Sequence, residues 1–174
     1  MSEATRDARP RPETPAEVPA EMTDHWTQRV LEEHRELARK TLELRRFLEE
    51  PRPEIGSKGA HSWAAELAGK LIALHDELFR HFRFEDEGGM VEDLSTSHPR
   101  ASAKIEDLVN EHPVFLREVR RLMEEALTYS EGKTPDAPAL RHSVISLLDR
   151  LRLHEQAENH LIQGLEYRDL GAPD

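Results

Sequence analysis

Residues 67–85 read LAGKLIALHDELFRHFRFE, and the fold follows from this stretch. Its leucines recur at alternating steps of four and three residues, a spacing that places them along one face of an α-helix. The stripe begins with leucines and ends in two ionisable residues, running Leu67, Leu71, Leu74, Leu78, His81 and Glu85. A helix buries such a stripe against other helices, so the stretch predicts an all-α protein.

Three further segments carry an apolar stripe with the same spacing, and each contains a histidine. The first stripe runs Val30, His34, Leu37, Thr41, Leu44 and Leu48. The next runs Ala101, Ile105, Leu108, His112, Phe115, Val119, Leu122 and Ala126. The last runs Val144, Leu147, Leu151, His154, Glu158, Leu161 and Leu165. No segment alternates with the period of two residues typical of a β-strand. Together the four stripes predict an antiparallel, up-down four-helix bundle.

Prolines and glycines frame the four helical segments. The predicted helices cover roughly residues 23–50, 58–87 and 97–131, and a fourth begins after Pro138 and ends near Gly164 or Gly171. Residues 1–22 hold four prolines among charged residues and offer little to bury, which predicts a disordered tail. At 174 residues, the chain has room for one domain with a substantial core, so residues 23–174 are predicted to form a single bundle.

The composition excludes several classes of site and partner. A net charge of -11 disfavours binding to nucleic acid or to anionic membrane surfaces. The sequence has no cysteine, which excludes disulfides, thiolate metal ligands and a cysteine nucleophile. It has no run of about 18 apolar residues and no apolar N-terminal signal segment, so we expect a cytoplasmic protein without a membrane span.

Six ionisable residues lie inside the apolar stripes and need a shared explanation. They are His34, His81, Glu85, His112, His154 and Glu158. An unpaired carboxylate in a bundle core costs on the order of several kcal/mol and would normally protonate. A metal ion removes this cost. Imidazoles and carboxylates without thiolates suit iron, manganese or zinc, and two carboxylates able to bridge suit a dinuclear centre. We therefore predict that the six residues converge on a metal site.

The ligand pattern occurs twice along the chain. His34 precedes HFRFE in one half, and His112 precedes HEQAE in the other, which predicts two helical hairpins related by a pseudo-two-fold axis. The zinc-protease motif HExxH fails because Glu158 replaces its second histidine, and the ExxH motif of ferritin-like diiron oxidases is absent. Asp86 or Glu87 is a candidate for an outer contact. A metal-free interaction bundle is the alternative interpretation.

Four stretches resemble the hemerythrin-like, or HHE cation-binding, family of non-heme diiron four-helix bundles. They are LEEHRELARK, HFRFEDEGG, NEHPVFLREVRRL and HEQAENHLIQ, and the resemblance extends over about residues 23–171. It implies two iron ions bridged by an oxo or hydroxo group and by the carboxylates of Glu85 and Glu158. The remaining ligands that it implies are the histidines His34, His81, His112 and His154.

The chain departs from the oxygen-carrying members of that family at two positions. Those proteins have HxxxH on the third helix and HxxxxD on the fourth, whereas this chain has Leu116 and Asn159 at the matching positions. The resulting set of four histidines and two glutamates is similar to the branch linked to iron-centre repair and nitric-oxide response. The smaller set should leave each iron with an open coordination position.

The resemblance implies a protein that binds or senses a small molecule, namely dioxygen, nitric oxide or peroxide, or that handles iron. A diiron enzyme turning over peroxide or nitric oxide, or an iron-centre repair protein, is the alternative. The sequence identifies no protein partner.

Overall fold

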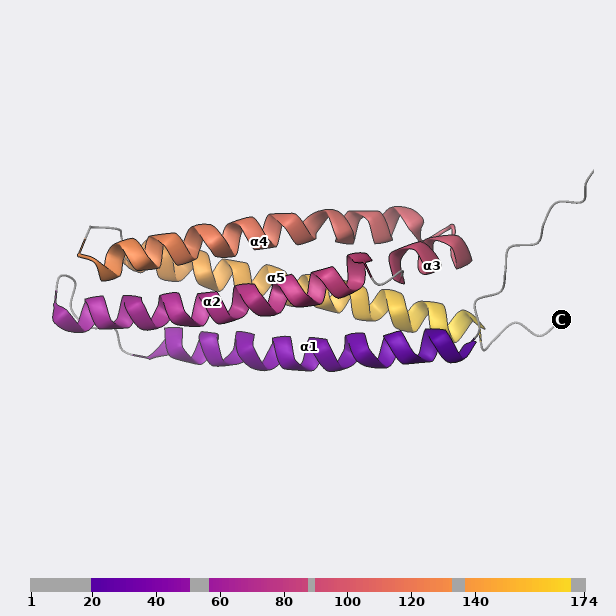
Figure 1. Ribbon diagram of the computed structural model, residues 1–174, viewed down its shortest axis with the longest axis horizontal. Helices are drawn as coiled ribbons and strands as arrows, with labels where there is room; N and C mark the ends of the chain where they lie inside the picture. The colour runs from indigo at the N-terminus through magenta and orange to yellow at the C-terminus, as the bar shows by residue number, and fades with distance from the viewer. Residues whose placement is uncertain (1–19, 51–56, 88–89, 133–136, 170–174) are drawn as a thin grey trace, which may run out of the picture.

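The structure is a computed structural model that describes residues 20–50, 57–87, 90–132 and 137–169. It contains five helices: α1 (Ala20–Glu49), α2 (Lys58–Glu87), α3 (Met90–Ser97), α4 (Ser102–Ser130) and α5 (Ala137–Asp169). The four long helices lie side by side and alternate in direction, so α1 begins and α5 ends at the same end of the bundle (Figure 1). The predicted all-α, up-down bundle is confirmed.

Several features of the helices differ from the sequence prediction. The first helix begins at Ala20 rather than near Thr23, and residues 1–19 of the predicted tail lie outside the described residues. The short helix α3 was not predicted, because eight residues give too short a pattern to identify. It lies at one end of the bundle, beyond the end of α2 and beside the start of α4 (Figure 1).

A turn separates α3 from α4 where the sequence predicted a helix start. The amide of His98 donates to the carbonyl of Leu94 at 2.8 Å, and the amide of Ala101 donates to the carbonyl of His98 at 2.8 Å. Helix α4 therefore starts at Ser102, three residues after Pro99. Proline suits a turn as well as a first helical turn, so its position alone did not separate these two structures.

The stripes form two apolar clusters of unequal size. The large cluster, which we call the main core, includes Leu37 of α1, Leu78 of α2, Phe115 of α4 and Leu151 of α5. The small one, which we call the end cluster, consists of buried side chains that lie toward α3, namely Val30, Leu94, Ile105 and Ile162. On each long helix the histidine of the stripe falls between these two clusters, so the fold places a polar layer within an apolar interior.

None of the helices that the structure describes is long and apolar enough to cross a membrane.

Candidate metal centre

The polar layer brings together all six residues that the sequence singled out. Helix α1 contributes one of them, α2 two, α4 one and α5 two, and none is more than 7% exposed: His34, His81, Glu85, His112, His154 and Glu158. The helical period explains the local placement, because residues four apart, such as His81 and Glu85, project from the same face of α2. The antiparallel arrangement of the four long helices then brings these six side chains to the same level along the bundle.

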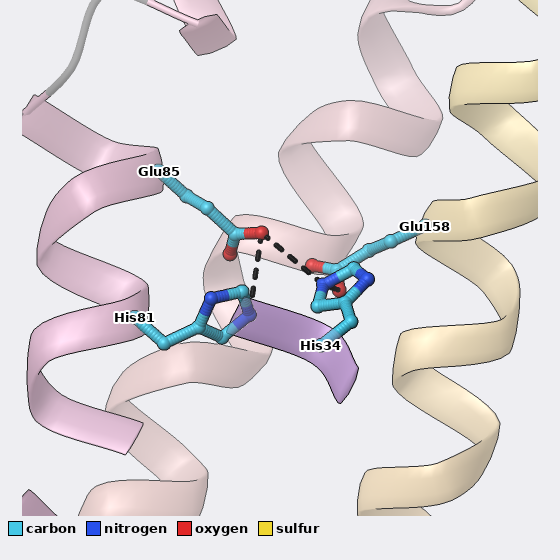
Figure 2. Close-up of side chains that lie close together, drawn as sticks. All are labelled: His34, His81, Glu85 and Glu158. Carbon is cyan, nitrogen blue, oxygen red and sulfur yellow. Dashed lines mark ion pairs between the residues drawn. The ribbon is translucent and has the colours of Figure 1, made fainter. Parts of the chain in front are cut away.

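The two carboxylates lie between the four imidazoles. His81 Nε2 is 3.3 Å from Glu85 Oε1, and His34 Nε2 is 3.7 Å from the same oxygen and 3.3 Å from Glu158 Oε2 (Figure 2). On the other side, His112 Nε2 lies 3.5 Å from Glu85 Oε2 and 3.5 Å from Glu158 Oε1. His154 Nε2 lies 2.9 Å from Glu158 Oε1. Each carboxylate therefore approaches imidazoles from both hairpins.

These short contacts are not hydrogen bonds. The buried Nε2 atoms of all four histidines, both oxygens of Glu85 and Oε2 of Glu158 have no hydrogen-bond partner among the described residues. Buried polar groups are normally paired, so the cluster needs another partner. Two ligand atoms about 2.1 Å from one ion and about 90° to 110° apart would lie about 3.0 to 3.4 Å from each other. The observed spacings are close to this range, so the six side chains fit a metal site.

The ligand atoms form two groups around the shared carboxylates. One group contains His34, His81, Glu85 and Glu158, and its ligand atoms all lie within 4.8 Å of one another. The other contains His112, His154 and Glu158 under the same limit. Because Glu158 belongs to both groups and Glu85 also reaches His112, the arrangement suits two cations with carboxylates between them.

Each imidazole is held in place by a hydrogen bond from its other nitrogen. The Nδ1 atoms of His34 and His81 donate to Asn159 Oδ1 at 3.1 Å and to Glu33 Oε2 at 3.4 Å. The Nδ1 atoms of His112 and His154 donate to Asp86 Oδ1 and Glu111 Oε2, both at 2.9 Å. Oxygen acceptors keep the proton on Nδ1, which leaves the Nε2 lone pair directed at the site.

Aromatic rings support the imidazoles on the side of the main core. Phe82 stacks on His112 with ring centroids 4.0 Å apart and planes 6° apart. Phe115 meets His154 edge-on with centroids 5.2 Å apart. These rings exclude water and restrict the two imidazoles to one orientation.

Without a metal, the cluster holds charge in an unusual distribution. Burial alone lowers the pKa of His34, but the nearby carboxylates of Glu158 and Glu85 outweigh it and raise the pKa to about 10. Burial, helped by the charge on His34, lowers the pKa of His81 to about 3. Burial raises the pKa of Glu85 to about 7, whereas contacts with three imidazoles hold the pKa of Glu158 well below its usual range despite burial. A bound cation would take the place of the protons that these side chains hold.

Several residues beside the cluster accept hydrogen bonds from its histidines and were not predicted from the sequence. Glu33 and Glu111 directly precede His34 and His112, yet each accepts a hydrogen bond from the histidine on the other helix of its own hairpin. Of the two acidic candidates for an outer contact, Asp86 does bind His112, whereas Glu87 pairs with Arg83. The repeat itself carried the missed signal, because EH occurs in both halves at residues 33–34 and 111–112.

Glu155 is a further carboxyl close to the site. It is 9% exposed, and its Oε1 has no hydrogen-bond partner among the described residues. Burial raises its pKa to about 7, and the charge on His34 opposes the shift. This position could not be identified from the apolar stripe, because Glu155 lies beside the stripe rather than within it.

A small apolar cavity adjoins the carboxylates on the side of α3. Its polar lining comes from Glu85, His112 and Glu158, and its volume is about 20 Å³, room for one molecule of about the size of water. The rest of the lining is aliphatic and comes mainly from α3, α4 and α5: Val91, Leu94, Ile105, Leu108, Val109, Leu161 and Ile162. A small ligand could reach the carboxylates there without meeting another charged group.

Comparison with known proteins agrees with this geometry. No curated protein and no solved structure gives a significant match to the chain. The chain does match the family model described as the hemerythrin HHE cation binding domain, over residues 26–165. The match spans most of the chain and includes all six residues of the cluster, so the protein belongs to the hemerythrin HHE cation-binding domain family.

Proposed function

We propose that the protein holds two iron ions in the polar layer and binds a small molecule there, namely dioxygen, nitric oxide or peroxide. The proposed ligands are the six clustered residues, with Glu85 and Glu158 each shared between the two ions. Iron would supply redox chemistry and a coordination position for the small molecule. Binding would serve to sense or to scavenge this molecule.

One observation carries the proposal. Four imidazoles each donate a hydrogen bond from Nδ1, while their Nε2 atoms converge without partners on two buried carboxylates. A polar core built only for stability would pair these atoms with one another, because unpaired buried groups cost on the order of 1–3 kcal/mol each. The arrangement instead keeps ligand atoms free for cations, in agreement with a cation-binding family.

The apolar cavity supports a small ligand rather than a large substrate. Its volume of about 20 Å³ excludes an organic substrate of ordinary size. Its mainly aliphatic lining favours a neutral diatomic molecule or peroxide over a hydrated ion, because aliphatic side chains cannot replace the hydration that a charged ligand would lose.

Absorption spectroscopy of protein purified with iron tests the proposal. An oxo-bridged ferric pair should absorb in the near ultraviolet, and elemental analysis should give two irons per chain. Anaerobic addition of nitric oxide to the reduced protein should change the spectrum until binding saturates. Protein that folds but takes up no iron would show that the cluster serves structure alone.

Turnover separates the proposed function from the enzymatic alternative. A binding protein saturates at about one small molecule per site and then stops. Continued consumption of peroxide or nitric oxide with an added reductant would identify an enzyme instead.

A further inference from the structure

The hydrogen bonds outside the ligand cluster follow the two-fold repeat with one exception. Glu33 and Glu111 are equivalent in the repeat, and each accepts from the HxxxE histidine of its own hairpin. Asp86 and Asn159 are also equivalent, since each directly follows the glutamate of an HxxxE pair. Asp86 accepts from His112 and Asn159 accepts from His34, so both cross to the other hairpin. One of these crossing acceptors is a carboxylate and the other is a neutral amide.

This difference between a carboxylate and an amide acceptor makes the surroundings of the two metal positions unequal. The position at His112 and His154 is backed by two carboxylates, each 2.9 Å from an Nδ1 atom. The position at His34 and His81 is backed by an amide oxygen at 3.1 Å and a carboxylate at 3.4 Å. Each position has two imidazoles and Glu158, and Glu85, which groups with His34 and His81, also lies 3.5 Å from His112 of the other position. The clearest contrast between the positions lies in the outer acceptors.

The nature of the outer acceptor changes how well an imidazole binds a cation. A carboxylate that accepts from Nδ1 pulls the proton toward itself and makes Nε2 a stronger donor, and it adds a negative charge close to the ion. A neutral amide fixes the ring but adds no net charge. Removing such an outer partner typically lowers metal affinity by about 10- to 100-fold.

We propose that the two metal positions are unequal, with the tighter position at His112 and His154, and that Asp86 and Asn159 set this difference as positioning residues. This inference rests on the proposed function, since it assumes that both positions take a cation. The ion at His34 and His81 is then the one that exchanges more readily.

Zinc binding to full-length variants that keep one intact position tests the inference without any activity. The substitution His34→Ala leaves the position at His112 and His154, and His112→Ala leaves the other. Competition with a chromophoric chelator should show that the His34→Ala protein binds zinc at least about tenfold more tightly than the His112→Ala protein. Equal affinities would overturn the proposal.

Exchanging the outer acceptors should then remove the difference in zinc affinity between the two variants. Adding Asp86→Asn to the His34→Ala protein should weaken zinc binding by about tenfold, and adding Asn159→Asp to the His112→Ala protein should strengthen it by a similar factor. If neither exchange changes the affinity, Asp86 and Asn159 do not set the difference. Each titration is repeated with Glu155→Gln, so that the other buried carboxyl near His34 contributes equally to all comparisons.

The outcomes distinguish this inference from the proposed function. If the wild-type chain binds no zinc or iron, both fail. If it binds two ions at positions of equal affinity, only this inference fails. Circular dichroism checks the fold of each variant, and for any that does not fold, Asp86→Ala is compared with Asn159→Ala in the wild-type background. The substitution Asp86→Ala should lower the affinity of the tighter zinc-binding step. The substitution Asn159→Ala should lower the affinity of the weaker step only.

Discussion

The bundle consists of two hairpins, α1 with α2 and α4 with α5. The two hairpins place the same residue types in the polar layer but surround them with different side chains. Their clustered histidines and glutamates correspond one to one, with His34 and His112 as one such pair. Beside this cluster the correspondence fails. Phe82 follows His81 and stacks on His112, whereas Glu155 follows His154 and lies buried without a partner for Oε1. The repeat therefore keeps the six residues of the cluster and changes the residues that surround them.

The largest effect should come from removing either shared glutamate. Glu85→Ala and Glu158→Ala each delete a carboxylate that both metal positions use, so both variants should lose both irons. His142→Ala changes an exposed histidine of α5 and should retain them. Elemental analysis of purified protein measures the result. Retention of two irons by both glutamate variants would refute the ligand assignment, and loss from only one would mean that the hairpins do not share the ions.

Metal removal should be the next largest effect. Chelation leaves two glutamates and four imidazoles in the layer between the main core and the end cluster, where their charges are poorly compensated. A ligand present at about 1,000 times its Kd stabilises a fold by about 4 kcal/mol, which corresponds to about 10 °C in Tm for a chain of this size. Calorimetry of the loaded and chelated protein measures the shift. An unchanged Tm would mean that the cations do not hold the hairpins together.

Filling the apolar cavity should weaken ligand binding without removing iron. Val109 of α4 lines the cavity, so Val109→Phe should reduce the affinity for nitric oxide by at least about tenfold and cost about 1–3 kcal/mol in stability. Val114→Phe is a matched control on the same helix, at a side chain that is 42% exposed. Anaerobic optical titration compares the two variants. Equal binding by both would place the ligand elsewhere.

A separate effect should appear in the pH dependence of the metal-free protein. Burial raises the pKa of Glu155 from 4.5 to about 7, so the folded state holds this proton more strongly than the unfolded state. As pH rises from about 4.5 to about 7, the folded protein loses stability, and Glu155→Gln should remove this loss. The variant should be roughly 3 kcal/mol more stable at pH 8 and nearly unchanged at pH 4. Urea unfolding at the two pH values measures this, and an equal difference at both would assign the effect to packing.

Much of the fold could be predicted because it depends on local periodicity. The stripes of leucines, with His34 or His81 among them, repeat at the helical period whatever the neighbouring helices do. The short helix α3 could not be predicted, because its eight residues are stable only against the end of the bundle. Glu155 also interacts with the charge of His34 on α1, and this depends on the packing of α1 against α5, which no pattern within α5 reveals.

The sequence by itself determined the helices, the apolar stripes and the set of six ionisable residues within them, since each follows from the spacing of residue types along one helix. Only the tertiary structure decided which nitrogen of each imidazole faces the carboxylates and which outer residue binds the other nitrogen. The pairing of Asp86 with His112 and of Asn159 with His34 crosses between hairpins. Such contacts depend on the height and rotation of one helix relative to another, and a one-residue shift along either helix would rotate the side chain by about 100° and break them.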